Sequence, residues 1–234
     1  MNRSIQFDPV QRSRDVEQIV MKGHKRRYYR FRFAKFYGGI VTADAVGCNL
    51  LCAYCWNYSR NLNPARFGDY YSPSEVAGKL MELAESHDCY QFRISGAEPI
   101  LGKVTAVHLA DIIKRLDGNF IIETNGVMLG ADPSLVEILE ALPDIHVRLC
   151  IKAHGGFDFE KITGAKAEGL DYQLRAAEEL RKAGISHTIA VMQPFVDPDK
   201  LPCQVDEVED LIAYGSTEKH LRLRGLCQKS GQID

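Results

Sequence analysis

The sequence predicts an α/β fold, in the form of a partial, open (β/α)6 barrel, and three observations support this prediction. Strand-like and helix-like segments alternate along most of the chain, which implies a parallel sheet with right-handed crossovers. The part of the chain after residue 38 is shorter than the roughly 250 residues of a closed eight-unit barrel, and it suits six units. Residues suited to chemistry follow the predicted strands, where α/β sheets bind their ligands.

The predicted strands are short apolar runs, and each is separated from the next by a helix-like segment. The first run, IVTADA, is typical of a buried strand. The six predicted strands are Ile40–Ala45, residues 90–94, residues 120–123, Ile145–Ile151, residues 185–191 and residues 221–226.

Helices are predicted where apolar residues recur at helical spacing between start and stop signals. Ser72 is a predicted N-cap, Pro73 occupies the first turn, and Glu75 completes a capping box. Gly184 is the predicted stop of a later helix. Two of the predicted helices begin at Ser72 and at Asp132. Three more occupy residues 103–116, 170–183 and 205–213, and the last of these has an acidic first turn.

Residues 1–38 are predicted to be a short basic N-terminal extension, and residues 39–234 to be the barrel. Basic and aromatic residues are interleaved between positions 22 and 37, and two interpretations stay open. Such a segment can bind nucleic acid or another anion. The alternation from Arg30 to Phe33 is also typical of an edge strand, with its rings inward and its guanidinium groups outward.

Composition and charge exclude several classes of protein. The hydrophobic fraction of 45% is ordinary for a globular chain, and the formal net charge of −2 argues against nucleic-acid or membrane binding through overall charge. No apolar run reaches the length of about 18 residues that a membrane helix needs, so no membrane partner is expected. The polar first residues lack the apolar core of a signal peptide. We therefore expect a cytoplasmic protein whose cysteines are thiols or metal ligands.

Three cysteines, Cys48, Cys52 and Cys55, lie within eight residues at the spacing C-x3-C-x2-C. Zinc and iron–sulfur clusters both take thiolate ligands, but each usually takes four. A four-iron cluster held by three cysteines leaves one iron open, which the amine and carboxylate of an amino acid can chelate. A zinc site completed by a remote histidine or cysteine is the alternative. The remaining cysteines are scattered: Cys89, Cys150, Cys203 and Cys227.

Unusual residues follow the other predicted strands as well. The stretch from Ser95 to Pro99 follows the second strand, and Glu123 to Gly126 end the third. Lys152 ends the fourth strand, Gln193 follows the fifth, and Arg224 lies near the end of the sixth. This convergence predicts one site at the carboxyl edge of the sheet.

With Tyr54 just before its last cysteine, the loop resembles the signature of the radical S-adenosylmethionine (SAM) superfamily. The resemblance implies a partial barrel of the radical SAM type and a [4Fe–4S] cluster held by Cys48, Cys52 and Cys55, with SAM on the fourth iron. It also implies that an electron, from a reductant such as a flavodoxin or ferredoxin, cleaves SAM to a 5′-deoxyadenosyl radical. This radical abstracts hydrogen from a substrate.

A second motif, Gly96-Ala97-Glu98-Pro99, resembles the Gly-Gly-Glu-Pro stretch that holds the SAM amino group in this superfamily. An ammonium group favours nearby carbonyl and carboxylate oxygens, and small residues let the backbone approach closely. Ala97 departs from the second glycine of the motif and needs an ordinary backbone conformation.

Within the superfamily, the chain is most similar to glycyl-radical-enzyme activases of the pyruvate formate-lyase activating type. The segments CAYCWN, ETNG and LCIK carry this likeness. It implies that Lys152 meets the SAM carboxylate and that Asn125 belongs to the SAM site, whereas Glu123 either binds SAM or caps the next turn. Cys150 stands where those activases have aspartate, and their Gly-Pro-Gly–Arg stretch before the cysteines is absent.

The sequence leaves the substrate unidentified. One candidate is a protein modified in the manner of the activases. A second is a nucleobase-like small molecule or RNA, as in the deazaguanine-forming branch of the superfamily. A zinc-bound, non-catalytic module is the alternative from a different class.

Overall fold

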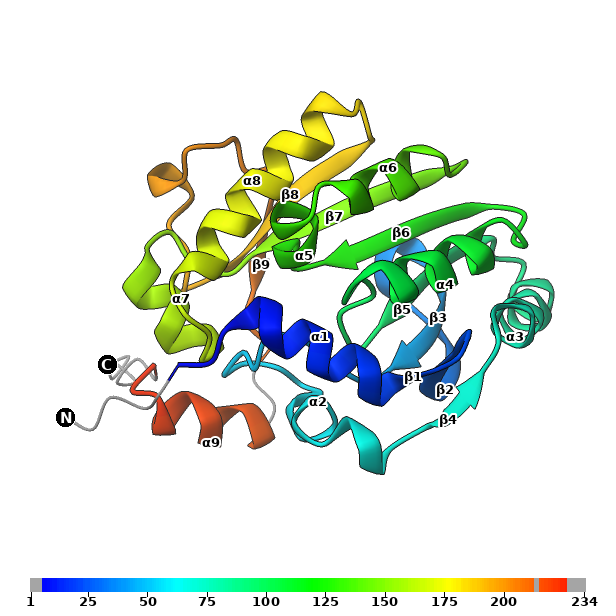
Figure 1. Cartoon of the computed structure of the whole chain (residues 1–234), viewed down its shortest axis with the longest axis horizontal. Helices are drawn as coiled ribbons and strands as arrows, with labels where there is room; N and C mark the ends of the chain where they lie inside the picture. The colour runs from blue at the N-terminus through cyan, green and yellow to red at the C-terminus, as the bar shows by residue number, and fades with distance from the viewer. Residues whose placement is uncertain (1–5, 213–214, 227–234) are drawn as a thin grey trace, which may run out of the picture.

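The computed structural model describes residues 6–212 and 215–226 and shows a curved, open sheet (Figure 1). Six parallel strands follow one another in space in the order in which they occur in the chain, so each connection is a crossover to the neighbouring strand. The predicted partial barrel of six parallel strands is therefore confirmed. These strands are β3 (Ile40–Ala45), β5 (Gln91–Ser95), β6 (Asn119–Thr124), β7 (Ile145–Ile151), β8 (His187–Gln193) and β9 (Glu207–Asp210).

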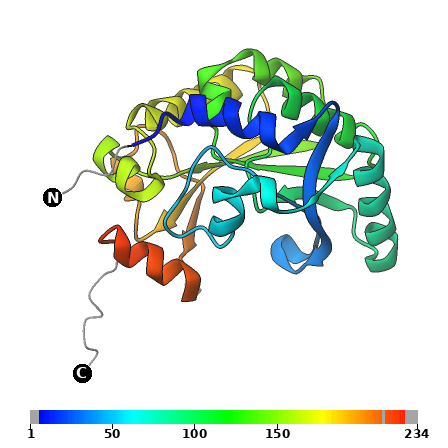
Figure 2. The same ribbon diagram turned by 60° about the horizontal axis from the view of Figure 1, so that its bottom comes forward.

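Helices cover one face of this sheet, and Figure 2 shows the green and teal helices arching over its convex side. The predicted capping box is present, because the Ser72 hydroxyl accepts from the Glu75 N–H while the Glu75 carboxylate accepts from the Ser72 N–H. The helices are α1 (Pro9–Val20), α2 (Tyr58–Leu62), α3 (Pro73–His87), α4 (Lys103–Ile113), α5 (Val127–Ala131), α6 (Ser134–Glu140), α7 (Gly156–Thr163), α8 (Glu168–Lys182) and α9 (Gly215–Leu223). Short 3₁₀ turns lie at Phe36–Gly38, Pro64–Arg66 and Pro198–Lys200.

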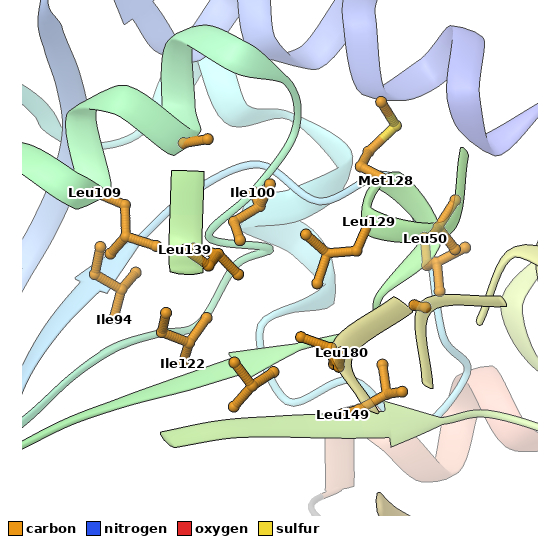
Figure 3. Close-up of a cluster of buried hydrophobic side chains, with 14 of the residues drawn as sticks. Leu50, Ile94, Ile100, Leu109, Ile122, Met128, Leu129, Leu139, Leu149 and Leu180 are labelled. Carbon is orange, nitrogen blue, oxygen red and sulfur yellow. The ribbon is translucent and has the colours of Figure 1, made fainter. Parts of the chain in front are cut away.

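The hydrophobic core lies between the sheet and these helices, as Figure 3 shows. Ile94 and Ile122 project from neighbouring strands toward Leu109 of α4 and Leu139 of α6, and all four side chains are almost fully buried. Each such side chain stabilises the fold by about 1.5–3 kcal/mol through burial. The core fixes the strands whose ends carry the candidate site.

The basic N-terminal segment forms strand β2 of the same sheet, and its Arg30–Phe33 stretch pairs with β3 alone among the described residues, as predicted for an edge strand. Strand β2 (Lys25–Ala34) pairs antiparallel with β3, with β1 (Met21–Lys22) and with β4 (Asp69–Tyr71), and β4 lies on the edge opposite to β3. The period-two alternation is real: Phe31 and Phe33 pack against the core, while Arg30 and Arg32 bind Asp44 of β3. The predicted domain boundary at residue 38 stays a prediction. Strand β2, which precedes it, pairs with β3 and so belongs to the barrel sheet.

The last two predicted elements are wrong. The acidic segment predicted as helix 205–213, whose residue 213 lies outside the described residues, contains strand β9. Glu207 and Glu209 are two apart and thus lie on one face of the strand, where both carboxylates bind Arg148 of β7 at 2.7 Å. The predicted strand 221–226 is absent: its first half ends α9, with Leu221 buried and Leu223 exposed, and residues 224–226 follow the helix without regular structure.

No helix in the described part of the chain is long and apolar enough to cross a membrane.

Candidate active site

A cavity of about 550 Å³ opens at the carboxyl ends of the parallel strands, a volume within the usual range of small-molecule sites. Its lining comes from β2, from the cysteine loop and from the ends of the successive parallel strands, including the segment that follows β9. Of the predicted site residues, all except Pro99 line it: Cys48, Cys52, Cys55, Gly96, Ala97, Glu98, Glu123, Asn125 and Lys152.

The cysteine loop is held in place by its backbone. Leu51 and Ala53 donate N–H groups to the carbonyls of Thr163 and Ile162, at 3.0 and 2.8 Å. These bonds dock the loop on the end of α7 and fix the backbone on either side of Cys52. The sulfur positions are therefore set by the barrel rather than by the loop alone.

Each of the outer two sulfurs receives N–H donors. The Leu50 N–H lies 3.4 Å from Cys48 Sγ, and the Asn125 amide lies 3.8 Å from the same atom. The Asn61 amide donates to Cys55 Sγ at 3.7 Å. Donors of this kind stabilise thiolate ligands and tune the metals they hold.

Burial keeps the three bare thiols protonated at neutral pH. It raises the pKa of Cys48 to about 12 and the pKa values of Cys52 and Cys55 to about 11. Metal binding therefore has to displace these protons. Cys227 lies outside the described residues, and Cys89 and Cys203 do not line the cavity.

The donor set fits an iron–sulfur cluster. Three thiols and their N–H donors line one cavity, and thiolates are the ligands that such clusters take. Within residues 6–212 and 215–226, no group of three or more His, Cys, Asp or Glu side chains surrounds a single metal-ion position. A four-iron cluster places its cysteines on different irons, so three sulfurs need not meet at one point.

The stretch after β5 is shaped by Gly96. Its φ of 79° is in the left-handed region, and an added Cβ would lie only 3.0 Å from the Asn57 amide and 3.2 Å from the Ala45 carbonyl. The Gly96 carbonyl accepts from Asn57 and Asn61, at 2.6 and 2.9 Å. The cysteine loop and the Gly96–Pro99 stretch are thereby held together by side-chain amides.

Glu98 joins the ends of two strands. Its buried carboxylate accepts hydrogen bonds from the Thr124 hydroxyl at 2.6 Å, from the Asn125 N–H at 2.8 Å and from the Ile100 N–H at 3.2 Å. Burial raises the pKa of this carboxyl group, while these donors oppose that shift. The side chain thus fixes Asn125 beside Cys48.

Arg26 is one of the site residues that sequence reasoning missed. This fully buried arginine of β2 donates to the carbonyl of Glu98 at 2.6 Å and to the carbonyl of Pro99. It therefore holds the backbone of the Gly96–Pro99 stretch from behind the cavity. Arg26 belongs to the basic segment between positions 22 and 37, which the sequence does reveal. The sequence does not show which arginine of that segment points inward.

Lys152 follows β7 and lines the cavity beside the cysteine loop. Its Nζ lies 5.9 Å from the centroid of the Tyr54 ring, and no ion pair of this ammonium occurs within the described residues. Burial lowers the pKa of Lys152, whereas Tyr54, Cys150 and Cys52 raise it, and the net shift is upward. Lys152 thus lines the cavity without an ion-pair partner among the described residues, where it can meet an anion.

Glu123 does not cap the turn that follows β6. Its carboxylate accepts from Arg93 at 2.7 Å and from the Tyr37 hydroxyl at 2.5 Å. The turn is capped instead by Thr124 and Asn125, whose side-chain oxygens accept from the N–H groups of Gly126 and Val127.

Two residues expected at strand ends lie away from the cavity. Gln193 is exposed at the end of β8 and is absent from the cavity lining. Arg224, which follows α9, donates to the Ile162 carbonyl at 2.8 Å. Because Ile162 also anchors the cysteine loop, Arg224 supports that loop from outside the cavity.

Comparison with known families matches residues 43–202, most of the barrel, to the sequence model described as Radical SAM superfamily. The chain belongs to the Radical SAM superfamily. Proteins of this superfamily are enzymes that bind a [4Fe–4S] cluster and SAM, so the predicted cofactors are confirmed at the level of the family.

Individual relatives agree with this membership. The chain is 28% identical over 181 residues to a probable GTP 3′,8-cyclase of Thermoplasma volcanium, a match that covers 76% of this chain and 49% of the relative. The chain thus spans about half the length of that curated relative. The likeness within the superfamily is to a cyclase, and the activase subgroup is not confirmed.

Solved structures share the fold. SuiB of Streptococcus suis bound to S-adenosylmethionine is 17% identical, with a TM-score of 0.56 over 78% of this chain and 45% of that one. SuiB bound to its precursor peptide SuiA is 18% identical, with a TM-score of 0.51 over 67% of this chain and 34% of that one. At these identities the likeness concerns the fold alone.

Proposed function

We propose that this protein reductively cleaves SAM at a [4Fe–4S] cluster held by Cys48, Cys52 and Cys55. When bound, the cluster supplies the electron for this cleavage, and the 5′-deoxyadenosyl radical then abstracts a hydrogen atom from a substrate in the cavity. One observation carries the proposal. The cysteine loop and the Gly96–Pro99 stretch are joined by amide hydrogen bonds at the edge of one cavity.

The residues around the cysteines position the ligands. Leu50, Asn61 and Asn125 direct N–H groups at the sulfurs, which stabilises their deprotonated form. Glu98 accepts three hydrogen bonds and thereby orients Asn125, and its carboxyl group lines the cavity where the SAM ammonium is expected. Gly96 and Ala97 line the cavity with small residues, which suit the close approach of SAM to the backbone.

Lys152 is the proposed partner of the SAM carboxylate. Its Nζ lies in the cavity wall beside Tyr54 and has no ion-pair partner among the described residues, so it suits the SAM carboxylate. Glu123 is committed to Arg93 and Tyr37, and we therefore assign it to the shape of the cavity wall. A reductant such as a flavodoxin or ferredoxin is the proposed electron donor.

For the substrate, we favour a nucleobase-containing small molecule over a protein. The curated relative is a probable GTP 3′,8-cyclase, and this name gives a nucleotide as its substrate. Modification of a protein in the manner of the glycyl-radical-enzyme activases is the second candidate, supported by the segments CAYCWN, ETNG and LCIK.

The cysteine assignment is tested by anaerobic reconstitution of single variants. Wild-type protein should bind about four irons per chain, and Cys48→Ala, Cys52→Ala or Cys55→Ala should each abolish the cluster. The matched controls Cys89→Ala and Cys203→Ala should keep it, because neither residue lines the cavity. Stoichiometric zinc without iron in the wild type would contradict the proposal and favour a zinc-bound module.

A further inference from the structure

Strand β2 carries a bulge that decides which of its side chains face the cavity. Tyr28 lies opposite Ala45 of β3, yet Arg30 lies opposite Asp44, so Tyr29 is an extra residue without a partner in the pairing. A shift of one residue exchanges the two faces of a strand. As a result Tyr28, Phe31 and Phe33 all pack against the core, although their positions differ in parity.

The bulge therefore directs Arg30 and Arg32 into the cavity. Both side chains line it, and both bind Asp44, whose carboxylate is fully buried. Without the extra residue, the same alternation would present Phe31 and Phe33 to the cavity. Bulges beside active sites commonly re-aim side chains in this way.

The end of the cavity next to β2 carries two positive charges, on Arg30 and Arg32, and one negative charge, on Asp44. Arg32 binds Asp44 through two donors, Nε at 2.7 Å and Nη2 at 3.2 Å, which is enough to neutralise one carboxylate. Arg30 adds a third hydrogen bond to Asp44 through Nε at 2.6 Å. Its side chain is 48% exposed, so its outer donors face the cavity.

The other arginines of the cavity are balanced differently. Arg93 pairs with Glu123, and Arg148 pairs with both Glu207 and Glu209, each at 2.7 Å. Those regions are neutral or negative, whereas two guanidinium groups share one carboxylate at β2. The cavity is thus positive at this end in addition to the Lys152 side.

We propose that Arg30, held in place by Asp44, is a specificity-determining residue that binds an oxyanion of the substrate, either a phosphate or a carboxylate. Arg32, which binds the same aspartate, adds positive charge beside it. This inference rests on the proposed function, because it assigns the substrate of the same site. The guanidinium fork suits both oxyanions, and its fixation by Asp44 lowers the entropy lost on binding.

The test uses anaerobically reconstituted holoenzyme, saturated with SAM and left unreduced, in calorimetric titrations with four probes. GTP and inorganic tripolyphosphate carry phosphate, citrate carries only carboxylate, and guanosine carries neither. Wild type should bind the anionic probes more tightly than guanosine, and the tighter of tripolyphosphate and citrate identifies the type of anion. Arg30→Gln should weaken that binding at least about tenfold, as expected for a charge-assisted hydrogen bond.

Two further variants make the result specific. Arg14→Gln removes the same charge from an exposed position of α1 and should bind the probes as wild type does. Arg30→Lys keeps the charge but loses the fork, and its affinity should lie between those of wild type and Arg30→Gln. All variants should keep their iron and SAM affinity, because Arg32 still neutralises Asp44.

Three results would overturn this inference. The first is wild type that binds neither anion better than guanosine, and the second is equal weakening by Arg30→Gln and Arg14→Gln. The third is a loss of SAM affinity in Arg30→Gln, which would make the residue part of the SAM site. Failure of the proposed function is a separate outcome, namely wild type that binds no cluster or does not cleave SAM on reduction.

Discussion

A single buried guanidinium fixes the backbone of the SAM-side motif. Arg26 has no exposed surface and places its two Nη groups on the carbonyls of Glu98 and Pro99. Buried carbonyls that lose their donors cost about 1–3 kcal/mol each. The residue that holds this stretch thus comes from a strand more than 70 residues earlier in the chain.

Arg26→Met should therefore lower the apparent melting temperature and weaken SAM binding together. Loss of two buried hydrogen bonds predicts a destabilisation of about 2–5 kcal/mol, although the methionine keeps much of the packing. Arg27→Met is the matched control, since Arg27 donates to Phe67 and Gly68, away from the motif. Thermal unfolding and SAM titration of the cluster spectrum check both effects, and unchanged SAM affinity in a destabilised Arg26→Met would limit this residue to stability.

Lys152→Met should weaken SAM binding while the cluster and the melting temperature stay nearly unchanged. The substitution keeps the aliphatic stem and removes a charge-assisted hydrogen bond of roughly 1.5–3 kcal/mol, which corresponds to about 10- to 150-fold in affinity. Titration of the reduced cluster's spectrum with SAM measures it. The control Lys161→Met, in α7, should have no effect, and equal affinities for Lys152→Met and wild type would show that Lys152 does not bind SAM.

Strand β2 and helix α4 meet through a neutral histidine. His108 is buried, with its Nε2 lying 3.0 Å from the Tyr28 hydroxyl and its Nδ1 lying 2.8 Å from the His24 carbonyl. Burial lowers the pKa of His108 to about 4. The unfolded chain protonates this histidine near pH 6.5, whereas the folded protein does not until near pH 4.

Acid should therefore destabilise the contact between β2 and α4. The contribution of His108 to stability is fully present above pH 6.5 and is lost as the pH falls toward 4, by about 2 kcal/mol between pH 7 and pH 5. His108→Gln should lack this slope in denaturant unfolding measured at the two pH values. Parallel pH dependences of the variant and wild type would refute the assignment.

Strand β2 also decides whether the barrel folds without its N-terminal residues. All six residues of β3 are buried, β2 covers one edge of that strand, and Arg26 and Tyr28 of β2 are themselves buried. A chain that begins at residue 39 should show no cooperative unfolding transition by circular dichroism. A truncated chain that melts like wild type would mean that residues 1–38 are a separable extension.

Elements with strong local patterns were predicted correctly from the sequence. Prediction failed for segments whose structure depends on contacts with residues far away in the chain. The capping box at Ser72 and the apolar runs of β3 and β7 were predicted correctly because their signals are local. The segment around Glu207 has carboxylates that suit a helix start, but it pairs with β8 as a strand, and Glu207 and Glu209 bind Arg148. The inward turn of Arg30 depends on a bulge that no periodicity reveals.

At the scale of the whole molecule, the candidate site was predictable because parallel strands bring their carboxyl ends together. Residues from Cys48 to Lys152 that are far apart in the chain line one cavity as a direct result of the strand order. The contacts of the residues that support that site, Arg26, Asn57 and Asn61, were not predictable, although Asn57 lies in the segment CAYCWN. Their partners are backbone carbonyls, which carry no sequence signature.

The central claim is that this barrel cleaves SAM at a cluster held by the cysteine loop. The most direct test is to reduce reconstituted protein with dithionite in the presence of SAM and to quantify 5′-deoxyadenosine and methionine by mass spectrometry. The account predicts that wild type forms both products in equal amounts and that Cys52→Ala forms neither. Wild type with a full four-iron cluster and bound SAM that forms no 5′-deoxyadenosine on reduction would contradict it.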